Sequence, residues 1–114
     1  MSREAGQQAE ERAAAYLLAQ GLKLEARNFQ TRYGELDIVM RDGQTWVCVE
    51  VKARRRSTHG LASEFVTASK CRKLQTCFEQ YLLARGLNPN HTSMRLDVVA
   101  LDNQNLQWIK NIAG

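Results

Sequence analysis

The chain has 114 residues, of which 44% are hydrophobic and 25% are charged, and its formal net charge is +4. This length and composition predict a single folded domain over residues 1–114 and exclude a largely disordered chain. We expect a cytoplasmic protein without a membrane partner, because no apolar run could span a bilayer and no secretory signal is evident. Three cysteines without a Cys-x-x-Cys pair argue against a disulfide framework or a zinc site. The positive charge suggests an anionic partner.

The first predicted element is a helix over residues 3–20, where Ala, Glu and Gln are dense. Ser2 is a plausible N-cap residue and Gly21 a plausible end. Glu10 lies in line with the apolar stripe of this helix, so its carboxylate could reach into a site as a ligand. The alternative is an acid that lies near the helix N-terminus because the helix dipole favours it there.

The next predicted elements are strands. Residues 22–28 alternate apolar and charged side chains, which is typical of a half-buried strand. Residues 34–40 and 46–52 follow as a β-hairpin, because Asp42-Gly43 between two runs of β-branched and apolar residues favours a two-residue turn.

In a hairpin built on that turn, Ile38 pairs with Val47 and Glu35 lies opposite Glu50. Strand side chains alternate between the two faces. One face is therefore predicted to carry Leu36, Ile38, Met40, Val47, Val49 and Val51. The other is predicted to carry Glu35, Asp37, Val39, Trp46, Cys48, Glu50 and Lys52, so that three acids and a lysine converge at one end.

This convergence of acids is unfavourable unless a cation balances it. Asp37 and Glu50 are predicted to be diagonal neighbours with Cα atoms about 7–8 Å apart, and like charges opposed across a hairpin are destabilising. Partial burial among Val and Ile side chains adds to the cost. Carboxylate oxygens are the ligands that Mg²⁺ and Mn²⁺ prefer, which predicts a metal site. The alternative is a solvent-exposed face on which Lys52 neutralises one acid.

Two basic segments follow the hairpin. Residues 53–60 predict a polar loop that begins directly after Lys52 and so lies beside the acids. Residues 65–85 predict a second helix with a basic first half. A solvated surface is the alternative for both segments, but we expect phosphate contacts from Arg54, Arg55, Arg56, Lys70 and Lys73.

Two further strands are predicted over residues 95–101 and 106–112, joined by a turn. The element order is then α-β-β-β-α-β-β. A strand, a helix and a strand in succession from residue 45 to residue 101 imply a parallel pair, whereas the hairpins are antiparallel. The sequence therefore predicts an α/β fold in which a mixed sheet is flanked by two main helices.

Asp37, followed thirteen residues later by Glu50-Val51-Lys52, resembles the PD-(D/E)xK motif of restriction-endonuclease-like nucleases, with Leu36 in the place of the proline. Over nearly its whole length the chain more closely resembles the YraN-type family of small uncharacterised bacterial proteins. That family in turn resembles archaeal Holliday-junction resolvases, in which an acid of the first helix joins the metal site. The matching elements are Gly6 with Glu10 and Ala13, Asn28, Gly34-Glu35-Leu36-Asp37, Val49-Glu50-Val51-Lys52 with Arg54, Lys70, and Arg95-Leu96-Asp97-Val98.

The resemblance implies a restriction-endonuclease-like fold and a metal-dependent endonuclease, with Mg²⁺ or Mn²⁺ as cofactor. Its substrate would be nucleic acid, with DNA favoured over RNA and branched DNA as one candidate. Asp37, Glu50 and the backbone carbonyl of Val51 would hold the metal, and Glu10 and Glu35 would join them directly or through water. Lys52 would orient the attacking water or neutralise charge in the transition state, which makes Glu10, Asp37, Glu50 and Lys52 the catalytic set.

Two other classes of protein stay open at this point. The first is a nucleic-acid-binding module of the same fold without useful turnover. The second is an interaction protein whose acidic cluster is only a solvated face. Assembly into a homodimer is compatible with each of these alternatives.

Overall fold

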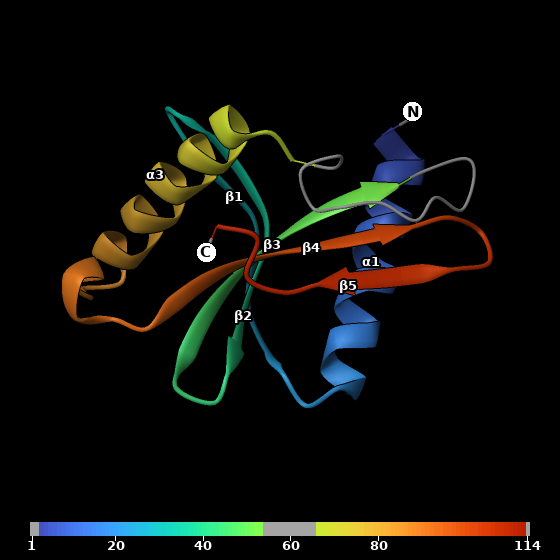
Figure 1. Ribbon diagram of the computed structural model, residues 1–114, viewed down its shortest axis with the longest axis horizontal. Coiled ribbons are helices and arrows are strands. Elements are labelled where there is room, and N and C mark those ends of the chain that lie inside the picture. The colour runs from blue at the N-terminus through green and yellow to red at the C-terminus, as the bar shows by residue number, and fades with distance from the viewer. Residues whose placement is uncertain (1–2, 54–65, 114) are drawn as a thin grey trace.

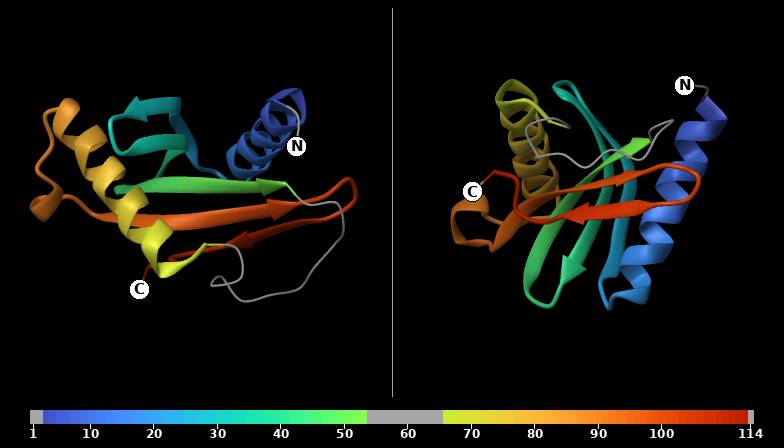
Figure 2. Two further views of the ribbon diagram at one scale, coloured as in Figure 1. Left: turned by 90° about the horizontal axis from the view of Figure 1, so that it is seen from above. Right: turned by 45° about the vertical axis from the view of Figure 1, so that its right-hand side comes forward.

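The computed structural model describes residues 3–53 and 66–113, and it has a five-stranded sheet with a helix on each face (Figures 1 and 2). Its strands lie in the order β1-β2-β3-β4-β5, with β3 and β4 parallel and the other neighbours antiparallel. The predicted α/β class, element order and parallel pair are confirmed, and the arrangement is consistent with a restriction-endonuclease-like fold. The elements are α1 (Arg3–Ala19), β1 (Lys23–Thr31), β2 (Gly34–Asp42), β3 (Thr45–Ala53), α3 (Ala68–Ala84), the 3₁₀ turn η1 (Pro89–His91), β4 (Met94–Leu101) and β5 (Leu106–Ile109).

Two separate apolar cores hold the helices to the sheet. The core under α1 is built from small and aliphatic residues, among them Ala13, Leu17, Ile38, Met40 and Val49. The core under α3 is larger and includes Leu74, Phe78, Tyr81, Val39, Cys48 and Leu96. Full burial of one such large side chain stabilises a fold by about 1.5–3 kcal/mol, so the two cores fix both helices firmly against the strands. None of the helices in the described part of the chain has the length and apolar character needed to cross a membrane.

Both helices end where the sequence indicated, and the start of α3 is capped. Gly21 has φ +99°, and the N–H of Leu22 donates to the carbonyl of Leu17 at 3.1 Å, which closes α1. The hydroxyl of Thr67 accepts the backbone N–H of Lys70 at 3.1 Å and is the N-cap of α3. The helix therefore begins later than the predicted residue 65, which lies outside the described residues, as does the predicted N-cap Ser2.

The hairpin of β2 and β3 turns one residue later than predicted. Asp42 pairs with Thr45, so the loop consists of Gly43 and Gln44, with Gly43 at φ +61°. Glycine at the first loop position is the requirement of a type II′ turn, which explains why Asp42-Gly43 was the wrong choice of loop. Ile38 therefore lies opposite Val49 rather than Val47. Because the register shifts by two residues, each side chain keeps its predicted face in this part of the hairpin.

The hairpin of β1 and β2 departs from strict alternation at Asn28 and Asp37. The register runs from Arg27 with Ile38 directly to Phe29 with Leu36 and leaves these two residues outside the regular pairs of β1 with β2. Asn28 has φ +54°. Asparagine tolerates this left-handed conformation better than most residues, and the turn of the backbone breaks the alternating pattern. Leu36 consequently packs in the α3 core with Val39, three residues away. The prediction that Leu36 shares the face of Ile38 is wrong.

The last strand is shorter than the predicted 106–112. After Ile109 the chain turns back, with Asn111 at φ +57°. The N–H of Asn111 donates to the Asp97 carboxylate at 2.9 Å, and the N–H of Ile112 donates to the Leu96 carbonyl at 2.8 Å. These two bonds tie the end of the chain to β4 in place of a longer β5.

Candidate functional site

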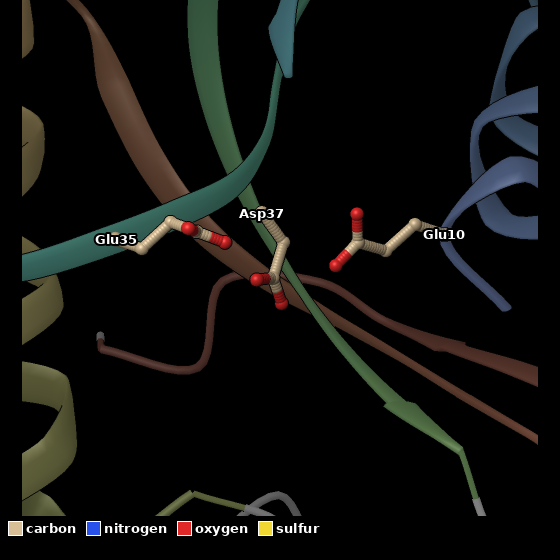
Figure 3. Close-up of side chains that lie close together, drawn as sticks. All are labelled: Glu10, Glu35 and Asp37. Atoms are coloured by element: carbon tan, nitrogen blue, oxygen red, sulfur yellow. The ribbon is translucent and has the colours of Figure 1, made fainter. Parts of the chain in front are cut away.

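Three carboxylates meet at one end of the sheet (Figure 3). Glu10 comes from α1, and Glu35 and Asp37 come from the start of β2. One carboxylate oxygen from each residue lies within 4.8 Å of the other two. Glu35 and Glu10 approach Asp37 from opposite sides. The structure therefore brings together three of the acids that the sequence singled out.

Side-chain amides hold these acids together. The Nδ2 of Asn28 donates to Glu10 Oε1 at 2.9 Å and to Glu35 Oε1 at 3.3 Å. The amide of Gln30 donates to the other oxygen of Glu35. The guanidinium of Arg27 lies 3.6 Å from Glu10 Oε1. Hydrogen bonds to ionised groups are among the stronger ones in proteins, so this frame offsets part of the repulsion between the acids.

Asp37 is the most perturbed acid of the site. Its Oδ2 accepts the backbone N–H of Val51 at 3.0 Å. Burial raises the pKa of Asp37 to about 8, with further contributions from the hydrogen bond to Glu50 and from the charges of Glu50 and Glu10, against a lowering by Val51. Near neutral pH this carboxyl group keeps its proton for much of the time, and a cation beside it would favour the ionised form.

Glu50 belongs to the same end of the sheet but has different partners. It is buried, with 5% of its surface exposed, and its Oε2 lies 3.5 Å from Lys52 Nζ and 3.2 Å from Lys70 Nζ. The last regular pair of β2 and β3 is Ile38 with Val49, so Glu50 follows directly beyond it. Its predicted pairing with Glu35 is wrong, because the observed register of β2 and β3 is shifted by two residues from the predicted one and places Val49, not Val47, opposite Ile38.

Lys70, for which the sequence predicts a phosphate contact, reaches the buried carboxylate of Glu50 from the first turn of α3. The Thr67 cap fixes where this turn begins. Lys73 lies one turn further along α3 and is exposed. The predicted phosphate contacts of Arg54, Arg55 and Arg56 lie outside the described residues.

Sequence reasoning gave Asn28 no role of its own and did not consider Gln30. Asn28 bridges an acid of α1 and an acid of β2, which gives no recognisable spacing in the sequence. The left-handed φ of Asn28 is not visible in the sequence either. Both amides line a pocket of about 330 Å³ beside the acids, to which Gly6 and Gln7 of α1 also contribute. The pocket gives the acidic group an opening on the side of α1.

A second buried acid, Asp97 of β4, has a structural role. Its carboxylate accepts the Nε of Arg95 at 3.1 Å, the indole N–H of Trp108 at 3.0 Å and the N–H of Asn111 at 2.9 Å. Arg95 also reaches the Asp42 carboxylate at 3.0 Å. Since its oxygens are satisfied by protein donors, Asp97 fastens β4, β5 and the β2–β3 turn to one another.

Comparison with known proteins gives one family. The model of the uncharacterised protein family UPF0102 matches residues 9–101. A UPF0102 protein of Vibrio cholerae serotype O1 is 42% identical over 112 residues, which cover 96% of this chain and 92% of the relative. A UPF0102 protein of Colwellia psychrerythraea is 44% identical over 114 residues, which cover 96% of this chain and 88% of the relative. A UPF0102 protein of Aliivibrio fischeri is 48% identical over 101 residues, which cover 87% of this chain and 82% of the relative.

Proposed function

The chain belongs to the uncharacterised protein family UPF0102, as its YraN-type resemblance indicated, and we propose that it is a metal-dependent endonuclease that hydrolyses phosphodiester bonds of nucleic acid. One observation carries the proposal. The carboxylates of Glu10, Glu35 and Asp37 lie within 4.8 Å of one another, next to a buried Glu50 that is bracketed by two lysines. This combination of clustered oxygen ligands and nearby ammonium groups suits the binding of a cation together with a phosphate.

The donor set fits Mg²⁺ or Mn²⁺. All of its groups are hard oxygen ligands, and neither histidine nor cysteine belongs to it. The pKa of Asp37 is raised because burial and the neighbouring acids disfavour its ionised form, and a divalent cation would favour that form. Asp37, Glu50 and the Val51 carbonyl would hold the cation, and Glu10 and Glu35 would complete the set. Mg²⁺ bound there would stabilise negative charge on the phosphate and on the leaving oxygen.

The two lysines would do the remaining electrostatic work. Lys52 and Lys70 now neutralise the same oxygen of Glu50. With a cation held by that carboxylate, both ammonium groups would be available to the phosphate and would stabilise the charge that develops in the transition state. Lys52 follows Glu50 at the alternate position of β3, on the same strand face, and in this proposal it would orient the attacking water.

A nucleic-acid-binding module without turnover is the second candidate, and one observation favours it. Glu50 already has two ammonium partners, and Asp37 holds a proton near neutral pH because of its raised pKa. The site therefore carries less negative charge than its four acids imply, and it could accept a phosphate without a metal ion. Branched DNA is a candidate substrate under the first proposal, the metal-dependent endonuclease.

Cleavage assays separate the two candidates. Labelled duplex, flap, four-way junction and single-stranded substrates are incubated with the wild type in Mg²⁺, Mn²⁺ or EDTA. The nuclease proposal predicts cuts in at least one substrate that need the metal and disappear in Asp37→Asn. Binding to these substrates without any cleavage, at all metal concentrations, would contradict it and favour the binding module.

A further inference from the structure

A second pocket lies at the tip of the β1–β2 hairpin, next to the acidic group. It has a volume of about 490 Å³ and is formed by the hairpin residues from Phe29 to Tyr33 together with Gln80 and Ala84 of α3. This volume lies within the range of ligand sites, roughly 300–1,000 Å³. Gln30 lines this pocket and also the smaller one that borders Glu10 and Glu35. The two pockets are therefore adjacent along β1.

The tip of the hairpin is held in place by several contacts. The hydroxyl of Thr31 donates to the Gly34 carbonyl at 3.0 Å and accepts the N–H of Tyr33 at 3.0 Å. The same hydroxyl lies 3.2 Å from the Sγ of Cys77 in α3. Gly34 has φ +144°, and a Cβ atom there would lie 3.6 Å from that sulfur. The two walls of the pocket are thus joined, and a joined pocket loses less freedom when a ligand binds.

The side chains at the tip are an aromatic ring and a cation. Tyr33 is 45% exposed, and the guanidinium carbon of Arg32 lies 5.1 Å from the centre of its ring. Arg32 also donates to the Tyr33 hydroxyl at 3.1 Å. Exposed aromatic rings with arginine beside them are the groups on which unpaired nucleobases stack. The amides of Gln30 and Gln80 add donors and acceptors of the kind that bind base edges.

We propose that this pocket binds one unpaired nucleotide of a nucleic-acid strand, with Tyr33 stacked on its base and with a neighbouring phosphate of the strand at the acidic group. The inference rests on the proposed function and names its substrate class, which is nucleic acid with an unpaired nucleotide next to the bond that is cut. A fully paired duplex cannot present the face of a base to Tyr33 without unstacking it. The adjacency of the two pockets through Gln30 is what links the base to the acids.

Binding without cleavage tests the pocket by itself. Fluorescence anisotropy in EDTA measures the affinity for two labelled DNA duplexes, one fully paired and one with a single unpaired nucleotide. We expect the wild type to prefer the second duplex, and Tyr33→Ala to weaken that binding on the order of tenfold with little change for the paired duplex. Tyr33→Phe keeps the ring and should keep the preference.

Tyr16 supplies the matched control. It is also exposed, at 37%, but its ring packs edge-on against Trp108 at 6.2 Å, and it is not among the residues that form either pocket. Tyr16→Ala should therefore leave both affinities unchanged. Circular dichroism and melting temperature verify that each variant is folded.

The possible failures of the two proposals differ. If the wild type binds and cuts nucleic acid while Tyr33→Ala matches it on both duplexes, the pocket assignment is overturned and the nuclease proposal stands. The pocket assignment also falls if Tyr33→Ala weakens both duplexes equally or if Tyr16→Ala has the same effect. If the wild type binds neither duplex and cuts none of the substrates above, both proposals fall together.

Discussion

The Nζ of Lys70 lies 3.2 Å from Oε2 of Glu50, which joins the first turn of α3 to the buried end of β3. Lys52, from the same strand as Glu50, lies 3.5 Å from the same oxygen. The candidate site thus draws one ammonium group from the sheet and one from a helix. Because Lys70 reaches the acids, its role should differ from that of the exposed Lys73 one turn away.

Replacing each of these helix lysines tests that difference. We expect Lys70→Ala to reduce the single-turnover cleavage rate at saturating enzyme by about tenfold or more, because it loses a charge beside the reacting phosphate. Lys73→Ala should instead lower the log–log dependence of affinity on salt by about 1, with little change in that rate. Equal cleavage rates in the two variants would mean that Lys70 is only a peripheral contact.

Lys52→Ala distinguishes an enzyme from a binding module. If Lys52 acts mainly in the transition state, its loss should slow cleavage by roughly 10²–10⁴-fold with a much smaller loss of affinity. Mn²⁺ binding should survive, because an ammonium group is not a metal ligand. Single-turnover kinetics and binding assays on the same variant give both quantities. A variant that loses affinity in proportion to rate would show that Lys52 is one phosphate contact among several.

Asn28 offers a test of how the acids are positioned. Its amide bridges Glu10 and Glu35, and its φ is +54°. Asn28→Gly keeps the backbone conformation accessible and removes the amide, whereas Asn28→Ala removes the amide and adds backbone strain. We expect both variants to bind Mn²⁺ more weakly, by about tenfold if the bridge acts as supporting groups of metal sites usually do.

Melting temperature separates the two effects of this substitution. Asn28→Ala should melt below Asn28→Gly because only the alanine variant is strained in the left-handed conformation. If Mn²⁺ affinity followed melting temperature and Asn28→Gly bound Mn²⁺ like the wild type, the role of Asn28 would be confined to the backbone.

The pKa of Asp37 is raised to about 8 in the fold from its ordinary value of 3.8, which predicts two pH effects of opposite sign. The folded state without metal binds this proton more tightly than the unfolded state does. The contribution of Asp37 to stability is therefore fully present below about pH 4 and is lost as the pH rises through 8. Metal binding needs the ionised form, so Mn²⁺ affinity should increase up to about pH 8 and then level off.

Asp37→Asn is the reference for both measurements. Its melting temperature should lack the decline that the metal-free wild type shows between pH 6 and pH 8, because the amide does not titrate. Melting curves at several pH values, together with Mn²⁺ titrations of the wild type, measure the two trends. A wild type whose stability rises over this pH interval as a result of Asp37 would contradict the assigned direction.

Much of this arrangement could be predicted from the sequence. The remaining features could not be predicted, and each failure has a physical reason. From Ile38 to Val49, alternation gave the correct faces of β2 and β3 although the register was off by two, because an even shift preserves the side on which a side chain lies. Glu10, Glu35 and Asp37 could be predicted as site residues from local patterns. Glu10 lies in line with the apolar stripe of a helix, and Glu35 and Asp37 lie two residues apart on a strand. The face of Leu36 was predicted wrongly because the left-handed backbone of Asn28 on the neighbouring strand breaks the alternation. Neither the helical nor the strand periodicity of the sequence indicates that conformation.

Long-range contacts were the least predictable feature. The approach of Lys70 to Glu50 depends on where α3 begins after the crossover from β3, and that start is set by the Thr67 cap. The satisfied environment of Asp97 likewise depends on Arg95, Trp108 and Asn111 meeting from three parts of the chain. Within the sequence, Asp97 could not be told apart from an acid with open ligand positions.

A divalent cation bound by Asp37 and its neighbours is the premise of the proposed nuclease function. Isothermal titration of Mn²⁺ into the wild type at pH 8 should show one weak site, which disappears in Asp37→Asn and weakens in Glu50→Gln and Glu10→Gln. Glu11→Gln is the matched control, because Glu11 follows Glu10 on α1 but is exposed and lies outside the group of three acids. Its Mn²⁺ binding should equal that of the wild type. Unchanged Mn²⁺ binding in Asp37→Asn would contradict a metal site at Asp37.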